Sequence, residues 1–302
     1  MRFNKLDLNL LVALNALLTE RSISRAAVRV HLSQPAMSNA LARLRAYFED
    51  ELLVPSGRQL IWTPRAEALV EPVREVLMRI DSTIAAQPRF DPATASRAFT
   101  LLVSDFTTTV FVPALLERLY HEAPGVRIDL RMQYTNPAEM LEQGDADLLI
   151  IPAQYASPDH PSQPLFEENY LCVTWTGNRH IQDKLSFDDY LAAGHVLANF
   201  SGAAQTPAFD GWFLERFGIT RRVEVTAPTL AALPSLVVGT DRIATVHRRL
   251  AERVRHLLPI RIWEPPLEIP KLVQMLQWHK YRNNDLALAW LRNCALEVGA
   301  KI

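Results

Sequence analysis

The stretch SISRAAVRVHLSQPAMSNALARLRAYF, residues 22–48, decides how the beginning of this chain folds. It contains two short helical patterns separated by a break at residues 31–33. Ser33 is a favourable N-cap for the second helix, and Pro35 fits its first turn, where a missing backbone N–H costs no hydrogen bond. The apolar residues of this second helix recur at helical spacing, which predicts one buried face: Met37, Leu41, Leu44 and Phe48.

The opposite face of the second helix carries short polar side chains at its start and guanidinium groups further along. Such groups bind base edges and phosphates when a helix lies in the major groove of DNA. In the preceding helix, Ala26 and Ala27 allow a neighbouring helix to approach closely, which is typical of a helix-turn-helix. The alternative is a surface helical hairpin whose charges are merely solvated. The residues predicted to contact DNA in this segment are Arg25, Arg29, Ser33, Gln34, Pro35, Ser38, Asn39, Arg43 and Arg45.

A hairpin and a long helix are predicted next. Apolar runs at residues 52–54 and 59–62 flank a turn at residues 55–57, as in a β-hairpin. From Arg65 to about residue 86, apolar residues recur every three or four positions. Such a seam favours pairing with a second helix, and the alternative is a helix that packs on its own domain. The seam consists of Ala66, Leu69, Val73, Val76, Leu77, Ile80 and Ile84.

Length and composition indicate a soluble globular protein of about two domains, with 302 residues, 49% of them apolar and 22% charged. Residues 1–65 hold nine Lys and Arg against five Asp and Glu, whereas the remaining residues hold 23 against 28. A basic head on an acidic body fits a nucleic-acid-binding module attached to another domain. We expect a cytoplasmic location, because we find no signal peptide, no bilayer-spanning run of ~18 apolar residues and no disulfide framework.

Beyond residue 95, short apolar runs alternate with helical segments, which favours parallel sheets covered by helices. Pro-rich places at residues 158–164 and 265–270 flank one block of this pattern, so we expect two α/β subdomains joined by a double hinge. The predicted strands are residues 99–103, 126–132, 147–151, 170–175, 195–200, 223–226, 242–246 and 260–263. The predicted helices are residues 110–122, 187–192, 212–217, 248–255 and 286–296.

The N-terminal segment closely resembles the winged helix-turn-helix of LysR-type transcriptional regulators. The resemblance rests on the opening LDLNLL of residues 6–11 and on SQPAMS at residues 33–38. It covers the full length and is nearest to the subgroup of nodulation-gene activators and regulators of aromatic degradation. That subgroup is supported by residues 98–111, ATVHRRLA at 244–251, WHKY at 278–281 and residues 285–292.

The resemblance implies an architecture and an assembly. Residues 1–64 would form the DNA-binding winged helix-turn-helix with Arg58 in its wing, and residues 65–90 would form a linker helix that pairs across a two-fold axis. Residues 95–302 would form an effector-binding α/β domain of periplasmic-binding-protein type. Its two Rossmann-like subdomains would be residues 95–164 with 266–302, and residues 165–265. The implied partners are a second copy in a homodimer, a dimer of dimers, an interrupted inverted repeat in double-stranded DNA, and RNA polymerase.

The effector site is expected beyond the carboxyl ends of the strands, where open α/β sheets bind ligands. The first of these ends opens a helix whose N–H groups favour an anion or a polarised oxygen. The residues that follow the strands there are Ser104, Asp105, Phe106, Thr107, Tyr134, Thr135, Phe200, Ser201, His247 and Arg248. The resemblance adds Phe111, Asn169, Thr206 and Val273.

Each of these residues also has a purely structural interpretation: Ser104 as a helix cap, Phe111 as core, Arg248 as a solvated charge. Asn169 stands where some regulators of aromatic acids carry histidine, which implies a different hydrogen-bonding pattern. We expect a small aromatic effector, phenolic, carboxylated or flavonoid-like, and no cofactor.

An enzymatic function is not predicted. His121-Glu122 lacks the second histidine of a metalloprotease helix, and residues 199–202 lack the glycines of a nucleophile elbow. The eight histidines are scattered, so we expect no metal site. The main alternative is a solute-binding protein for a small organic anion without DNA function, against which the helix-turn-helix and the missing signal peptide count.

Overall fold

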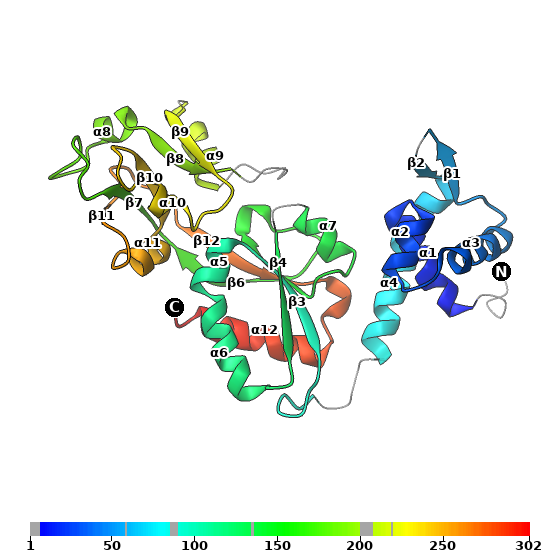
Figure 1. Ribbon diagram of the computed structural model, residues 1–302. Helices are drawn as coiled ribbons and strands as arrows, with labels where there is room; N and C mark the ends of the chain where they lie inside the picture. Colours follow the sequence, from blue (N-terminus) through cyan, green and yellow to red (C-terminus); the bar gives the residue numbers. More distant parts are fainter. Residues whose placement is uncertain (1–6, 58, 85–89, 134–135, 200–207, 219) are drawn as a thin grey trace. The chain divides into compact units, whose positions relative to one another are not determined.

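The computed structural model describes residues 7–57, 59–84, 90–133, 136–199, 208–218 and 220–302 (Figure 1). The chain divides into two compact units, Met1–Gln87 and Pro88–Ile302. Within the described ranges, we find no helix with the length and apolarity needed to cross a bilayer.

The N-terminal unit is a helix-turn-helix with a hairpin and a long helix, in the order α1 (Leu8–Glu20), α2 (Ile23–Arg29), α3 (Gln34–Phe48), β1 (Leu53–Ser56), β2 (Gln59–Trp62) and α4 (Pro64–Ile84). The Ser33 hydroxyl accepts a hydrogen bond from the Ala36 N–H, which confirms the predicted cap of α3. The turn before α3 places His31 in the left-handed region, at a φ of 55°, where histidine is found more often than most residues.

Small residues in α2 let the helices of this unit pack closely. Ala26 and Ala27 are fully buried, and α2 contacts both α1 and α3. Met37, Leu41 and Leu44 from α3 lie in the same core, together with the leucines of α1. The hydrophobic stripe predicted for the second helix is therefore its buried face, and its polar residues are left on the surface.

The long helix α4 packs partly on its own unit. Val73 is buried in the N-terminal core, where α4 lies against α1, and Leu69 and Leu77 pack beside it. Val76 from the same predicted seam is 42% exposed. The predicted seam therefore has two parts. Val73 and its neighbours pack on the helix-turn-helix, whereas Val76 faces away from this core.

The first sheet of the C-terminal unit has the strand order β4-β3-β5-β12-β6. Its strands are β3 (Ala98–Val103), β4 (Arg127–Met132), β5 (Leu148–Pro152), β6 (Ser162–Glu168) and β12 (Leu272–Gln277). β3 is parallel to β4 and β5, whereas β12 is antiparallel to both β5 and β6. Its helices are α5 (Asp105–Val110), α6 (Val112–Glu122), α7 (Pro137–Glu142) and α12 (Leu286–Gly299), and α12 packs on α6 and β6 (Figure 1).

The second sheet has the order β11-β7-β10-β8-β9. Its strands are β7 (Tyr170–Trp175), β8 (His195–Ala198), β9 (Val223–Ala227), β10 (Ile243–His247) and β11 (Ile260–Trp263). β10 is parallel to β8 but antiparallel to β7, and β11 is also antiparallel to β7. Helices α8 (Phe187–Ala192), α9 (Ala208–Phe217), α10 (Leu233–Leu236) and α11 (Arg248–Val254) belong to this half, and the short 3₁₀ turns Ala153–Tyr155 and Lys280–Arg282 belong to the first.

The α/β architecture was predicted, but the sheets are mixed, because parallel pairs are joined by antiparallel strands that the βαβ pattern did not indicate. The antiparallel strands β6 and β12 were not predicted, and residues 158–164 were interpreted as a Pro-rich connection. β6 tolerates Pro164 because it is an edge strand with a register shift opposite Gln274 and Met275. The predicted helix at residues 110–122 begins earlier, as α5, and is interrupted at Phe111 before α6.

The chain passes between the two sheets at two adjacent places. β6 ends at Glu168 and β7 begins at Tyr170, so the first crossing lies at Asn169 rather than at the predicted residue 165. The return strand β12 begins at Leu272, which pairs directly with Glu168. Both connections therefore leave the first sheet from one end of the β6–β12 ladder.

The start of α12 is fixed by a nearly buried ion pair. Arg97 donates to both carboxylate oxygens of Asp285 at 2.8 and 2.6 Å, and Asp285 also accepts the Leu288 N–H at 3.1 Å. Burial raises the pKa of Asp285, but the hydrogen bonds from Arg97 and Leu288 and the charges of Arg97 and Arg282 outweigh it and hold this pKa below its ordinary value. The Asp285 carboxylate is thus both a helix cap and the partner of a buried cation.

We predict that Asp285→Ala lowers the free energy of unfolding by about 3 kcal/mol, since it removes a helix cap and leaves Arg97 without its buried partner. Asp183→Ala, at an exposed carboxylate, is the control and should change stability by less than about 0.5 kcal/mol. Because the folded pKa is depressed, the Asp285 contribution is present above about pH 4 and is lost as the pH falls through the folded pKa. Urea unfolding at pH 7 and below pH 4 measures both effects, and equal values for the two variants at pH 7 would contradict this role.

Candidate DNA interface and effector site

Helix α3 presents a continuous polar surface. Gln34, Ser38, Asn39 and Arg43 are all exposed, while the opposite face of the helix is buried in the N-terminal core. Pro35 lies exposed in the first turn, and Ser33 caps that turn by accepting the Ala36 N–H. This surface has the donors and acceptors that base edges and phosphates require.

The arginines predicted to contact DNA are not equivalent in the structure. Arg43 is exposed and makes a loose pair with Asp7 at 3.6 Å. Arg45 instead donates to the backbone carbonyls of Glu51 and Leu53 at 2.8 and 2.9 Å. It joins the end of α3 to the hairpin, a structural role that the sequence pattern did not indicate. Arg58 lies outside the described residues.

Two of the predicted DNA-binding arginines lie on α2 beside Glu20. Arg25 contacts the Glu20 carboxylate at 3.3 Å and its backbone oxygen at 2.6 Å, and Arg29 contacts the carboxylate at 3.2 Å. These contacts fix α2 to the end of α1. Arg25 remains largely exposed, so its charge still faces the surface.

Polar contacts anchor the two ends of the hairpin to the rest of the N-terminal unit. The Trp62 indole N–H donates to the Leu18 carbonyl at 2.9 Å, and the Thr63 hydroxyl donates to Asp50 at 2.6 Å. The hydrogen bond from Thr63 and that from the Leu52 N–H lower the pKa of Asp50. Neither Asp50 nor Thr63 was singled out from the sequence, because their partners come from distant turns.

Aromatic side chains meet where the two sheets of the C-terminal unit join. Phe106 from α5 stacks on His247 at the end of β10, with ring centroids 4.0 Å apart and an interplanar angle of 21°. Phe166 on β6 lies between Phe106 and Phe111, at 6.4 and 5.9 Å, and Tyr170 lies 5.1 Å from His247. We call these five residues the crossover cluster, because they come from both sheets.

Polar contacts hold the two sheets together around the crossover cluster. The Asp105 carboxylate accepts the Ala231 N–H at 2.6 Å, and the Arg248 N–H donates to the Asn169 carbonyl at 2.8 Å. Arg249 donates to the fully buried Glu168 at 2.8 Å. The two halves are thus joined by hydrogen bonds that separation of the sheets would break.

His247 carries the most distinctive chemistry of the crossover cluster. Burial lowers the pKa of His247 to about 3, so its imidazole is neutral at physiological pH. Its Nδ1 atom has no hydrogen-bond partner among the residues that the structure describes. A buried polar atom without a partner is uncommon and is a natural point for a ligand hydroxyl or carbonyl to bind.

The predicted effector residues fall into three groups. Phe106, Thr107, Phe111 and His247 are buried in or beside the crossover cluster, and Ser104 is buried as the cap of α5, where it accepts the Thr107 N–H at 3.0 Å. Asp105, Asn169, Arg248 and Val273 are not buried, and Arg248 pairs with Glu264 at 2.9 Å. The remaining five lie outside the described residues: Tyr134, Thr135, Phe200, Ser201 and Thr206.

Sequence reasoning missed Phe166, Tyr170 and Arg249. Phe166 follows a Pro-rich segment that was interpreted as a connection, so its place in a strand was not recognised. Arg249 is the neighbour of the predicted Arg248, and it is Arg249 whose guanidinium reaches the buried Glu168. The sequence shows an adjacent pair of arginines at this position. Which of them reaches Glu168 depends on the register of α11, and a sequence pattern does not give that register.

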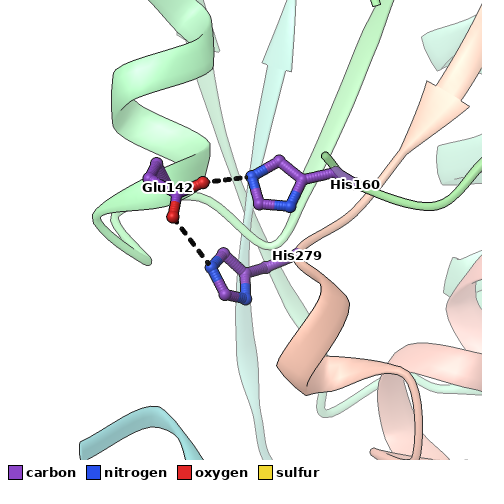
Figure 2. Close-up of side chains that lie close together, drawn as sticks. All are labelled: Glu142, His160 and His279. Carbon is purple, nitrogen blue, oxygen red and sulfur yellow. Dashed lines mark ion pairs between the residues drawn. The ribbon is translucent and has the colours of Figure 1, made fainter. Parts of the chain in front are cut away.

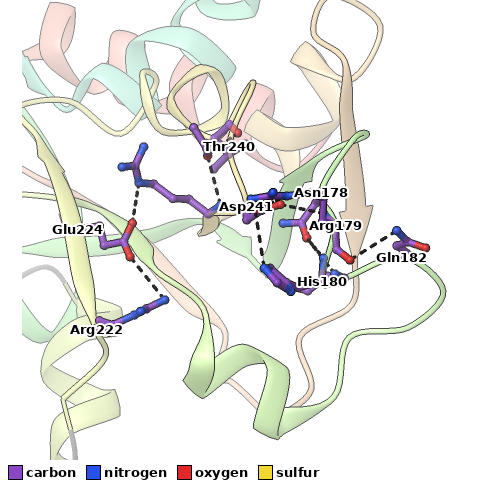
Figure 3. Close-up of polar contacts among 11 residues, drawn as sticks. Asn178, Arg179, His180, Gln182, Arg222, Glu224, Thr240 and Asp241 are labelled. Atoms are coloured by element: carbon purple, nitrogen blue, oxygen red, sulfur yellow. Dashed lines mark hydrogen bonds and ion pairs between the residues drawn. The ribbon is translucent and has the colours of Figure 1, made fainter.

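A pocket of about 730 Å³ lies at the other end of the second sheet. Its arginines pair with carboxylates: Arg179 donates to Asp241 at 2.9 Å, and Arg242 and Arg222 contact Glu224 at 2.9 and 3.4 Å (Figure 3). The hydrogen bonds from Arg179 lower the pKa of Asp241 to about 2. Because this pocket lies where β8 and β10 begin, it is not at the carboxyl ends where open α/β sheets bind ligands.

Comparison with known families covers nearly the whole chain. Residues 93–300 match the LysR substrate binding domain, and residues 8–67 match the bacterial regulatory helix-turn-helix protein, lysR family. Nodulation protein D from Bradyrhizobium sp. (strain ANU 289) is 44% identical over 302 residues, which is 100% of this chain and 89% of that protein.

Solved structures show the same architecture. A probable transcriptional regulator PA0477 from Pseudomonas aeruginosa is 29% identical with a TM-score of 0.65, covering 97% of each chain. Full-length CbnR complexed with its target DNA shares the fold at 17% identity, with a TM-score of 0.55 over 97% of this chain and 100% of that one. The N-terminal match removes the alternative of a solute-binding protein without DNA function. The chain belongs to the LysR family of DNA-binding transcriptional regulators, which are not enzymes, and combines a helix-turn-helix with an effector-binding domain.

Proposed function

We propose that this regulator binds a small aromatic effector at the crossover cluster and that the effector changes how the protein holds DNA. The observation that carries the proposal is the stack of Phe106 on a neutral, buried His247 whose Nδ1 lacks a partner among the described residues. A planar ring can stack on either aromatic side chain, and a phenolic hydroxyl can bind Nδ1. The relatives named nodulation protein D support a regulatory role connected with nodulation.

The proposed coupling uses the contacts between the two sheets. Phe106 and Asp105 belong to the first half, and their partners His247 and the Ala231 N–H belong to the second. An aromatic ligand that enters between the stacked rings must move the halves relative to each other. Because a ligand stabilises the arrangement that it binds better, its binding shifts this equilibrium, and linkage passes the shift to DNA affinity.

On the DNA side, we propose that Gln34, Ser38 and Asn39 contact base edges and that Arg43 contacts phosphate. These four side chains are exposed on one helix, and the capped first turn fixes the orientation of that helix. A symmetric pair of such helices would recognise an interrupted inverted repeat. The pairing would use the seam of α4, where Val76 is exposed although it is apolar.

The first prediction concerns base readout. Gln34→Ala should weaken binding to the cognate operator by about 1–3 kcal/mol and binding to random DNA much less, because a base contact contributes only on the correct sequence. Gln154→Ala, an exposed glutamine of the C-terminal unit, is the matched control. Fluorescence anisotropy at fixed salt measures both affinities. An equal loss on the two DNAs would show that Gln34 only positions the protein.

The second prediction concerns dimerisation. Val76→Asp should place a charge in an apolar helix seam, dissociate the dimer and abolish operator binding. Glu67→Ala changes an exposed residue on the opposite side of α4 and should leave the dimer intact. Sedimentation of both variants provides the measurement. If Val76→Asp sediments like the unmodified protein, α4 does not form the interface.

The third prediction concerns the effector. His247→Phe keeps an aromatic ring beside Phe106 but removes both ring nitrogens, so it should weaken binding of a phenolic or carboxylated aromatic ligand about tenfold or more. His256→Phe, at an exposed histidine, is the control. Calorimetry with phenols, aromatic acids and flavonoids on the full-length chain tests this. The aromatic proposal fails if only sugars or amino acids bind, and the site fails if an aromatic ligand binds both variants equally.

A further inference from the structure

Two histidines and a glutamate meet at the end of the β6–β12 ladder opposite the crossover cluster (Figure 2). Glu142 is the last residue of α7, His160 precedes β6, and His279 follows β12. The Glu142 carboxylate lies 2.6 Å from His160 Nε2 and 3.9 Å from His279 Nε2. All three possible ligand atoms lie within 4.8 Å of one another.

The two imidazoles are buried and incompletely bonded. Each histidine side chain is 1% exposed, whereas Glu142 is 27% exposed and gives the cluster an opening to solvent. His279 Nε2, which points toward Glu142, has no hydrogen-bond partner among the described residues. Hydrogen bonds within the triad therefore do not account for the position of His279, although buried polar atoms are almost always bonded.

We propose that Glu142, His160 and His279 bind a divalent transition metal ion, and that this ion is Zn²⁺. Two imidazole nitrogens and one carboxylate form a donor set that zinc accepts with a fourth position left for water. Hard ions such as Mg²⁺ and Ca²⁺ prefer oxygen ligands, so nitrogen donors select against them. The scattered histidines of the sequence did not predict this site.

Binding requires the three side chains to adjust. Ligands of tetrahedral zinc at 2.0–2.1 Å are separated by about 3.3 Å. The Glu142 Oε2 atom lies 2.6 Å from His160 Nε2 and the Glu142 Oε1 atom lies 3.9 Å from His279 Nε2, and the three ligand atoms lie within 4.8 Å of one another. Coordination through Nε2 leaves the His279 proton on Nδ1, which now accepts the Tyr281 N–H at 3.2 Å. Binding must break this bond, and because Tyr281 is partly exposed, water can replace the imidazole as its acceptor.

The ion would join three segments that are far apart in the sequence. It would fix the end of α7 and the loop before β6 to the end of β12, all within the first half of the C-terminal unit. Because the ligands converge only in the folded chain, zinc should bind the native state and stabilise it. This role is separate from effector binding at the crossover cluster and does not depend on it.

The test uses full-length protein without a polyhistidine tag, stripped with a chelator and dialysed against zinc. We expect one bound zinc ion per chain, a rise in melting temperature on zinc addition, and a tetrahedral absorption spectrum when Co²⁺ replaces zinc. Glu142→Gln and His279→Gln should each weaken zinc binding about 100-fold or more, and should remove the zinc-dependent rise in melting temperature. His121→Gln, an exposed histidine on α6, is the control and should keep both.

The cobalt spectrum is recorded on the unmodified protein. It therefore shows whether a tetrahedral metal ion binds even if a variant folds poorly. Unmodified protein that retains no zinc through dialysis would overturn the proposal. So would zinc that is retained equally by Glu142→Gln and His279→Gln, since the ion would then be held by other residues.

Discussion

The pairing of β12 with both β5 and β6 is the constraint on which the C-terminal unit depends. The chain leaves the first sheet after β6 and re-enters it with β12, so the whole second sheet is inserted between two strands that lie side by side. Glu168 and Leu272 are direct partners at the end of this ladder. Any movement of the second sheet must therefore pass through two backbone connections that start from the same place.

A buried ion pair holds the two halves together where the chain crosses between the sheets. Glu168 is fully buried at the end of β6, and a buried carboxylate is costly unless it is paired and hydrogen-bonded. Arg249 supplies the pair from the second half and also donates to the Glu167 carbonyl and to the Ile302 carbonyl of the first half. The stacked rings of Phe106 and His247 add an apolar contact beside it. These hydrogen bonds and the ring stack form only in particular relative positions of the two sheets. They therefore favour a few discrete arrangements of the two halves over continuous deformation.

The N-terminal unit differs in that it leaves the polar face of α3 exposed to solvent. Ala26 and Ala27 bring α2 close to its neighbours, so α3 buries its apolar stripe completely and exposes its polar residues. Arg45 and the Trp62 indole then tie the hairpin to α3 and α1 through backbone carbonyls. The polar face of α3 is therefore held in place by contacts behind it and beside it, and none of these contacts uses Gln34, Ser38 or Asn39.

Sequence alone determined the helix-turn-helix, the long helix after it, most strands of the α/β domain and the family, because these depend on local spacing, caps and short motifs. The direction of β6 and β12 was decided only by the tertiary structure, since pairing across long intervals leaves no local pattern and Pro164 suggested a loop. The same is true of the choice of Arg249 over Arg248, and of the meeting of Phe166 with Phe106. Glu142, His160 and His279 come from three distant segments, and only the fold of the first sheet brings their side chains within reach of one another.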